Sequence, residues 1–258
     1  MRKAVVYTGT SNLYGGMIAA CKSLIANSDI DDIWLLIEDD KFPVKLPDMI
    51  HTINASKIWQ DYIDPNSPNM KSRFSYMAVI RPAFCHIFPQ YDRILSLDVD
   101  TMVRTDISDL WDLDLSEYYI AGCAEPHHSR DGIVSINAGV VMMNLEKLRD
   151  GRADIIMDCL NVHELNFVDQ DAMTCLCQGR ILPIDNRYNG TKWTGCGEEC
   201  FIKHFAGIKD WYKMEEAIFW YNMKWEDVFL RHDTVLRKAG KAPSQPTTPA
   251  TIEGGDKR

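Results

Sequence analysis

Two acidic residues, Asp98 and Asp100, stand one residue apart directly after the apolar stretch 93–97, Arg-Ile-Leu-Ser-Leu. Side chains at i and i+2 of an extended chain point the same way, so the two carboxylates converge on one cation if the strand geometry persists, and face different edges if the chain bends. Two hard oxygen ligands favour Mg²⁺ or Mn²⁺, with a nucleotide diphosphate completing the shell. The pair therefore indicates a metal site at the end of a buried strand.

Two other functions of an acidic pair fit this pattern poorly. A calcium loop of the EF-hand type that starts at Asp98 would place Val103 where the turn needs glycine, and it would follow a strand instead of a helix. The two carboxylates of a glycoside hydrolase flank a sugar at roughly 5 to 9 Å, a separation that i and i+2 residues seldom reach. We therefore favour the metal site.

His204 lies between Ile202 and Phe205, where a strand histidine satisfied by one hydrogen bond is the simplest interpretation. A zinc site formed by His204 with Cys196 and Cys200 is a second interpretation. Its spacing matches no familiar zinc finger, and a structural zinc needs a fourth ligand, for which Cys175 and Cys177 are the candidates.

Short apolar runs of strand length alternate with segments of helical spacing, which predicts an α/β fold with a largely parallel sheet. The expected strands are 5–7, 33–37, 94–97, 120–123 and 140–143. A helix over 14–25 follows the polar turn 9–12, so it leaves the carboxyl end of the first strand, the edge at which open α/β sheets bind ligands.

Further helices are expected after this first unit. One covers 74–88 and starts or kinks at Pro82, which lacks a backbone donor. Asn144 or Asp150 is expected to cap a third, and Asp169 to cap a fourth that runs to Leu176. The third helix should bury an apolar face made of Ile155, Ile156, Cys159 and Leu160.

Composition places the chain among ordinary globular proteins, with 46% hydrophobic and 25% charged residues. Its 258 residues suit one catalytic domain over 1–240, with a flexible tail over 241–258 that is rich in Pro, Thr and Gly. The net charge of −9 argues against a nucleic-acid partner. The first strand begins too early to follow a signal peptide, and no apolar run has membrane-spanning length, so we expect a cytoplasmic protein.

In such a compartment the eight cysteines should remain thiols. Those with apolar neighbours are expected to be buried: Cys21, Cys85, Cys123 and Cys159.

Several segments taken in order resemble glycosyltransferase family 8, the retaining family that includes glycogenin and bacterial lipopolysaccharide galactosyltransferases. The segment 91–100 is similar to the family's Asp-x-Asp strand, with Ser96 in a slot that is usually aromatic. The segment 204–211 resembles its His-x-x-Gly-x-Lys-Pro-Trp element, with Asp210 in place of proline. The other similar elements are the loop 7–14, Arg81, the Asn-Ala-Gly segment 135–140 and the Asp-Gln-Asp segment 168–172.

The resemblance implies a single Rossmann-like nucleotide-sugar-binding domain of the GT-A type, with a mixed, mainly parallel sheet. It implies Mn²⁺, with Mg²⁺ as the alternative, held by Asp98, Asp100 and His204. It assigns catalytic roles to Gln170, Asp169 and Asp100. The donor contacts that it implies are Thr8, Thr10, Ser11, Tyr14, Arg81, Asp98, Val99, Asn137, Ala138, Asp169, Gly207 and Lys209.

The function implied by the resemblance is transfer of a hexose from UDP-glucose or UDP-galactose to a hydroxyl of a carbohydrate or glycolipid acceptor. No carboxylate nucleophile is obvious in the family, so same-face attack is favoured, with the Gln170 carbonyl oxygen stabilising positive charge. The alternative is a non-catalytic sugar-nucleotide-binding or partner-binding protein on the same fold. A third hypothesis concerns the helical segment 213–240, whose aromatic and basic residues suit peripheral contact with the inner membrane surface, although core packing also explains its aromatics.

Overall fold

The computed structural model describes all residues except 126–128, 130–132, 195, 197 and 244–258. Its centre is a seven-stranded sheet in the order β3-β2-β1-β4-β7-β6-β8. Every neighbouring pair is parallel except the two that involve β7, so the sheet is mixed and mainly parallel, as predicted. The strands are β1 (Ala4–Thr8), β2 (Asp32–Ile37), β3 (Ile50–Asn54), β4 (Arg93–Leu97), β6 (Ile120–Ala124), β7 (Ile136–Asn144) and β8 (Ile181–Ile184).

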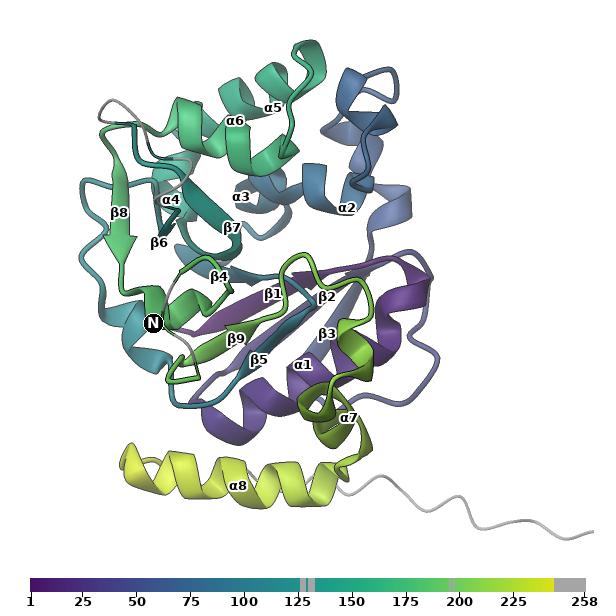
Figure 1. The fold of residues 1–258 in the computed structure, drawn as a ribbon, viewed down its shortest axis with the longest axis vertical. Coiled ribbons are helices and arrows are strands. Elements are labelled where there is room, and N and C mark those ends of the chain that lie inside the picture. Colours follow the sequence, from purple (N-terminus) through teal and green to yellow (C-terminus); the bar gives the residue numbers. More distant parts are fainter. Residues whose placement is uncertain (126–128, 130–132, 195, 197, 244–258) are drawn as a thin grey trace, which may run out of the picture.

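Helices cover both faces of the sheet (Figure 1). Because side chains alternate along a strand, Val5 and Tyr7 of β1 pack into one core and Val6 into the other. The first core lies under α1 (Tyr14–Asn27), α7 (Glu215–Asn222) and α8 (Trp225–Lys238). The second lies under α2 (Tyr76–Val79), α3 (Phe84–Ile87), α4 (Leu145–Leu148), α5 (Arg152–Val162) and α6 (Val168–Leu176).

A second, two-stranded antiparallel sheet joins distant parts of the chain. It pairs β5 (Thr101–Val103) with β9 (Ile202–His204), and its register sets Thr101 opposite His204. Since β5 begins directly after Asp100, this pairing brings the late histidine to the acidic pair. The backbone amide of Phe205 also donates to the carbonyl of Asp100 at 2.9 Å, which continues the pairing beyond the strands.

Several local expectations were wrong or incomplete. The helical zone over 74–88 does begin a new element at Pro82, as expected, but it is divided into α2, a 3-10 turn over Arg81–Ala83 and α3. Asn144 caps only the short α4, and α5 starts after Gly151, whose φ of 102° suits glycine. Sequence reasoning missed β3 and β8, which are the two edge strands of the sheet.

Burial also departs from expectation on α5 and α6. Ile155 was expected in the core, but it is 48% exposed, and Cys159 is only partly buried, because Ile156 and Leu160 form the buried face of α5. Asp169 does not cap α6: Phe167 holds the cap position, and Asp169 is buried within the first turn. All eight cysteines are free thiols, and Cys21, Cys85 and Cys123 are buried as predicted.

The C-terminal helices are tied to α1. Buried Lys22 donates from Nζ to the carbonyls of Tyr221 and Met223, at 2.7 and 2.6 Å, where α7 ends. Lys241, the first residue of the expected flexible tail, forms an ion pair with Asp29 at 2.7 Å. Within the described residues, no helix is both long and apolar enough to cross a bilayer.

Candidate active site

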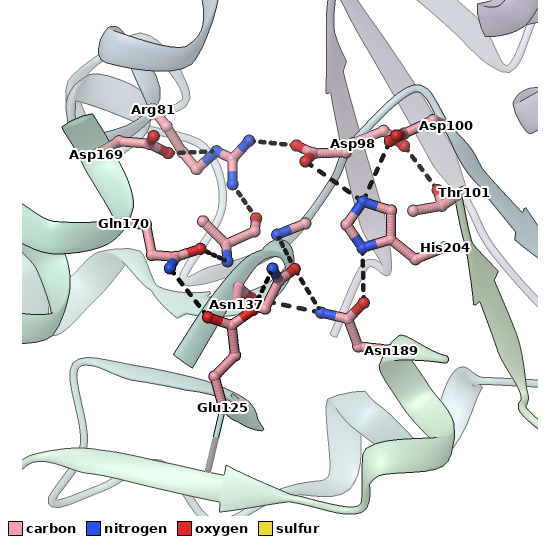
Figure 2. Close-up of polar contacts among 12 residues, drawn as sticks. Arg81, Asp98, Asp100, Thr101, Glu125, Asn137, Asp169, Gln170, Asn189 and His204 are labelled. Atoms are coloured by element: carbon pink, nitrogen blue, oxygen red, sulfur yellow. Dashed lines mark hydrogen bonds and ion pairs between the residues drawn. The ribbon is translucent and has the colours of Figure 1, made fainter. Parts of the chain in front are cut away.

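A cavity of about 880 Å³ opens at the carboxyl end of β4 and is lined by residues of four predicted motifs. Asp98 and Asp100 come from the β4–β5 connection, Asn137 to Gly139 from β7, and His204 from β9. Asp169 and Gln170 enter from the first turn of α6. The topology therefore brings together residues that are spread over a hundred positions of sequence, as Figure 2 shows.

Three ligand atoms of Asp98, Asp100 and His204 lie within 4.8 Å of one another. The Nε2 atom of His204 is 3.2 Å from Oδ1 of Asp100 and 3.8 Å from Oδ2 of Asp98. Two carboxylate oxygens and one imidazole nitrogen make a suitable donor set for Mn²⁺ or Mg²⁺. Because both acids face the histidine, the chain after β4 keeps their side chains on the same side in spite of the turn at Thr101.

The charges of this cluster are strongly coupled. Burial lowers the pKa of His204, but the charge of Asp100, a hydrogen bond to it and the charge of Asp98 outweigh burial and raise that pKa above its usual value. Burial raises the pKa of Asp100, yet the neighbouring imidazole outweighs it and holds that pKa below its usual value. A positive charge between these groups is therefore favoured, and a divalent cation supplies one.

Gly139 makes room for the histidine. A Cβ atom at this position would lie 2.1 Å from Cε1 and 2.6 Å from Nδ1 of His204, so no side chain fits there without displacing the ring. The carbonyl of Gly139 also accepts from the backbone amide of Asp98 at 2.9 Å. The glycine of the Asn-Ala-Gly segment thus determines the position of two members of the cluster.

Arg81 connects the acidic pair to α6. Its buried guanidinium donates from Nη2 to Asp98 Oδ1 at 2.6 Å and from Nη1 to the carbonyl of Ala138. Its Nε lies 3.3 Å from Asp169 Oδ2, an ion pair without hydrogen-bond alignment, and both atoms are buried without a hydrogen-bond partner. Burial, which outweighs the opposing charge of Arg81, raises the pKa of Asp169 to about 6. Asp169 Oδ2 can therefore accept a hydrogen bond from a ligand hydroxyl, and Arg81 Nε can donate one to a ligand hydroxyl.

Glu125 orders two amide side chains on the cavity wall. Its Oε1 accepts from Asn137 Nδ2 at 2.8 Å, and its Oε2 accepts from Gln170 Nε2 at 3.3 Å. The Gln170 carbonyl oxygen then accepts from the backbone amide of Ala138 at 3.0 Å, which leaves one of its lone pairs for a ligand.

Other predicted contacts lie outside this cavity. Thr8, Thr10, Ser11, Tyr14, Val99 and Lys209 are all described, and none of them lines it. The Tyr14 hydroxyl donates to Asp39 at 2.9 Å and its ring packs on Phe42, while the Val99 side chain is buried in the core. Arg81, Ala138 and Gly207 do line the cavity. Lys209 is exposed on the turn that follows β9.

His204 does not face the cysteines proposed for a zinc site. Its two ring nitrogens are directed to the acidic pair and to Asn189, whose Oδ1 lies 2.7 Å from Nδ1. Within the described residues, the cluster of Asp98, Asp100 and His204 is the one group of three ligands that is close enough for a metal. This geometry contradicts a zinc site formed by His204 with the cysteines and supports a metal site formed by His204 with the acidic pair.

Sequence reasoning missed several residues that line the cavity or support its lining. Glu125 and Asn189 lie in no recognised segment, and only their contacts with Asn137, Gln170 and His204 reveal them. The outer wall carries cations on aromatic rings: Arg73 lies 4.9 Å from the Phe74 ring centroid, and Lys192 lies 4.6 Å from that of Trp193. The pairing of basic with aromatic residues at 73–74 and 192–193 was the only signal in the sequence.

Comparison with known proteins agrees with this arrangement. The sequence model described as Glycosyl transferase family 8 matches residues 4–196. The glycosyltransferase GlyB of Streptococcus pneumoniae is 22% identical over 271 residues, which cover 91% of this chain and 65% of that protein. A putative glycosyltransferase of Haemophilus influenzae is 26% identical over 116 residues, which cover 39% of this chain and 34% of that protein. The chain thus matches between about one third and two thirds of the length of these relatives.

The fold is shared with a solved structure, the galactosyltransferase LgtC in complex with donor and acceptor sugar analogs. The TM-score is 0.64 at 19% identity, and the match covers 95% of this chain and 98% of LgtC. This likeness establishes the GT-A type of fold.

Proposed function

This chain belongs to glycosyltransferase family 8, and we propose that it transfers a hexose from UDP-glucose or UDP-galactose to an acceptor hydroxyl with retention of configuration. The observation that carries the proposal is the meeting of Asp98, Asp100 and His204 in one cavity with the amide wall of Asn137 and Gln170. A cluster that suits a cation bound to a diphosphate then lies beside groups that suit a sugar.

Asp98, Asp100 and His204 would hold Mn²⁺, with Mg²⁺ as the alternative. The bound ion would act as a Lewis acid and stabilise the negative charge of the leaving diphosphate. Lys209 adds a positive charge on the exposed turn after β9, close in sequence to His204. Gly207, with a φ of 73°, allows that turn to run along the cavity.

The sugar would lie against Asp169, Arg81 and the two amides. The unpartnered Asp169 Oδ2 and Arg81 Nε suit donor hydroxyls, and Asn137 retains one amide hydrogen for the same purpose. The fixed carbonyl oxygen of Gln170 would stabilise positive charge at the anomeric carbon during same-face attack. In this mechanism the leaving phosphate oxygen takes the proton of the acceptor hydroxyl.

The nucleoside would be bound where β1 leads into α1, by Thr8 at the end of the strand, Thr10 and Ser11 in the connection and Tyr14 at the start of the helix. Strands β1 and β4 are adjacent and parallel, with Tyr7 opposite Leu97, so the residues that follow each strand share one edge of the sheet. The side chain of Val99 is buried, so any contact it makes with the donor must come through its backbone. Tyr14 also supports the loop by accepting from the amide of Glu38.

The acceptor is proposed to be a carbohydrate or glycolipid, and the site of action the cytoplasmic face of the inner membrane. The support for membrane contact is an exposed apolar surface on α7, where Ile218, Phe219 and Tyr221 are 44%, 49% and 54% exposed. Lys213 and Lys224 flank that helix in the sequence. An apolar surface bordered by lysines suits an anionic bilayer.

The test is a panel of UDP-sugars incubated with Mn²⁺, with UDP release measured with and without carbohydrate acceptors. We expect release with one hexose donor, loss of release with a chelator, and a loss of at least ~100-fold in Asp100→Asn. Asp61→Asn, which changes an exposed acid outside the cavity, is the matched control and should keep full activity. Tight donor binding without turnover for any donor would favour the non-catalytic alternative.

A further inference from the structure

A chain of hydrogen bonds whose direction is fixed reaches the histidine of the metal cluster. It begins at the backbone amide of Gly139, which can only donate, and which gives its proton to Asn137 Oδ1 at 3.0 Å. That oxygen also accepts from Asn189 Nδ2 at 2.9 Å. The other atom of the Asn189 amide, Oδ1, lies 2.7 Å from His204 Nδ1 and must accept from it. The direction of the first bond therefore sets all the others (Figure 2).

The opposite orientation of the Asn189 amide is excluded by its neighbour. Rotation of that amide by half a turn would place its oxygen against Asn137 Oδ1, an acceptor already fixed by Gly139. The Asn137 amide cannot rotate either, because its Nδ2 donates to Glu125 Oε1 at 2.8 Å. The proton of the neutral imidazole is thereby assigned to Nδ1 of His204, and the lone pair of Nε2 faces the acidic pair.

Asn189 is held firmly enough to perform this role. Its side chain is fully buried at the end of the 3-10 turn Asn186–Asn189. The next residue, Gly190, lies beside β9: its amide donates to the carbonyl of Ile202, and its carbonyl accepts from the amide of His204 at 3.1 Å. The backbone segment that carries Asn189 is thus bonded to the same strand that carries the histidine.

We propose that Asn189 is a positioning residue that holds His204 in the tautomer and ring plane that present Nε2 to the divalent cation. Asn189 also joins the cation site to Asn137 on the amide wall. The inference rests on the proposed metal site. Asn189 lies outside the short segments in which the sequence resembles the family's motifs. A ligand imidazole whose second nitrogen is bonded to an oxygen acceptor is better oriented and more basic, and removal of such a partner typically weakens metal binding ~10–100-fold.

Three variants separate the contacts of Asn189. Asn189→Leu keeps the approximate volume and removes the bond to His204 and both bonds from Nδ2 to Asn137, to its Oδ1 and, at 3.5 Å, to its carbonyl oxygen. Asn189→Asp keeps the acceptor for His204 Nδ1 and removes the donor to Asn137. Asn186→Leu is the matched control, because it lies on the same turn and its amide bonds only to the backbone carbonyl of Thr194 among the described residues.

Binding of Mn²⁺ alone is measured through the electron paramagnetic resonance signal of the free ion, and folding through circular dichroism and thermal unfolding. We expect Asn189→Leu to bind Mn²⁺ ~10–100-fold more weakly, and Asn189→Asp and Asn186→Leu to bind within a few-fold of the unsubstituted protein. For Asn189→Asp, the KM for the donor should rise, since the link to Asn137 is lost. A folded Asn189→Leu that binds Mn²⁺ normally would overturn the proposal.

Nitrogen NMR of the metal-free protein gives a second readout that does not need the ion or the variants. At alkaline pH, the imidazole of His204 should carry its proton on Nδ1, and a proton on Nε2 would refute the inference even if Asn189→Leu failed to fold. If the unsubstituted protein bound no Mn²⁺ while the proton lay on Nδ1, the proposed metal-dependent function would fail. The inference that Asn189 sets the tautomer of His204 would still stand.

Discussion

Replacing Gly139 by alanine is expected to abolish metal binding through a single added methyl group. The new Cβ would lie 2.1 Å from Cε1 of His204, whereas ordinary contact begins near 3.4 Å, so the ring must retreat by about 1.3 Å. Metal–ligand bonds tolerate deviations of only about 0.2 Å, so a shift of this size removes the imidazole from the ligand set. Retreat is also costly, because the ring is buried and bonded to Asn189.

The loss should exceed the ~10–100-fold effect of removing an outer hydrogen-bond partner, because a direct ligand is displaced. Overpacking of a filled site should also lower the free energy of unfolding by about 1–3 kcal/mol. Mn²⁺ affinity, UDP release and urea-induced unfolding measure these effects. The control is Gly15→Ala on α1, where a Cβ would meet Tyr221 at an ordinary 3.6 Å, and where alanine should stabilise the helix by up to about 1 kcal/mol.

A Gly139→Ala protein that binds Mn²⁺ with unchanged affinity and unfolds at the same urea concentration would refute this reasoning. It would mean that the histidine can leave its observed position without consequence for the cluster. A loss of stability without a loss of affinity would also contradict it, because the close contact would then be relieved by movement of some group other than the His204 ring.

Three further predictions concern neighbouring residues and surfaces. Gln170→Ala should reduce turnover by less than Asp100→Asn does, because an amide oxygen that only stabilises positive charge is supportive; equal losses in UDP release would count against that role. Because burial raises the pKa of Asp169 to about 6, above ~3.9 in the unfolded chain, the folded protein retains this proton longer as pH rises. The free energy of unfolding should therefore fall by up to about 3 kcal/mol as pH increases from ~4 to above ~6, and urea-induced unfolding of metal-free Asp169→Asn should not show this pH-dependent decrease. Substituting Ser for the exposed Ile218 and Phe219 should reduce sedimentation with phosphatidylglycerol vesicles without lowering UDP release on a soluble acceptor; sedimentation equal to that of the unsubstituted protein would exclude this surface.

Features that depend on neighbours along the chain could be predicted from the order of the residues. The apolar runs that became β1, β2, β4, β6 and β7 are buried strands because burial and extended geometry act locally on such residues. The spacing of Asp98 and Asp100 after β4 indicated a shared cation, and their side chains do face a common point. The edge strands β3 and β8 escaped prediction because both are partly exposed; β3 mixes polar with apolar residues, and the four-residue β8 contains Pro183, which is atypical of a strand interior.

Tertiary structure alone decided what surrounds that acidic pair. Asp169 has the residue type of a helix cap, but Phe167 holds the cap position of α6, and Asp169 is buried in the first turn beside Arg81. Neither the space that Gly139 leaves for His204 nor the hydrogen bond from His204 to Asn189 follows from any spacing in the sequence. These contacts depend on the register of β5 with β9, which joins residues a hundred positions apart, and pairing at such separation is chosen by the packing of the whole molecule.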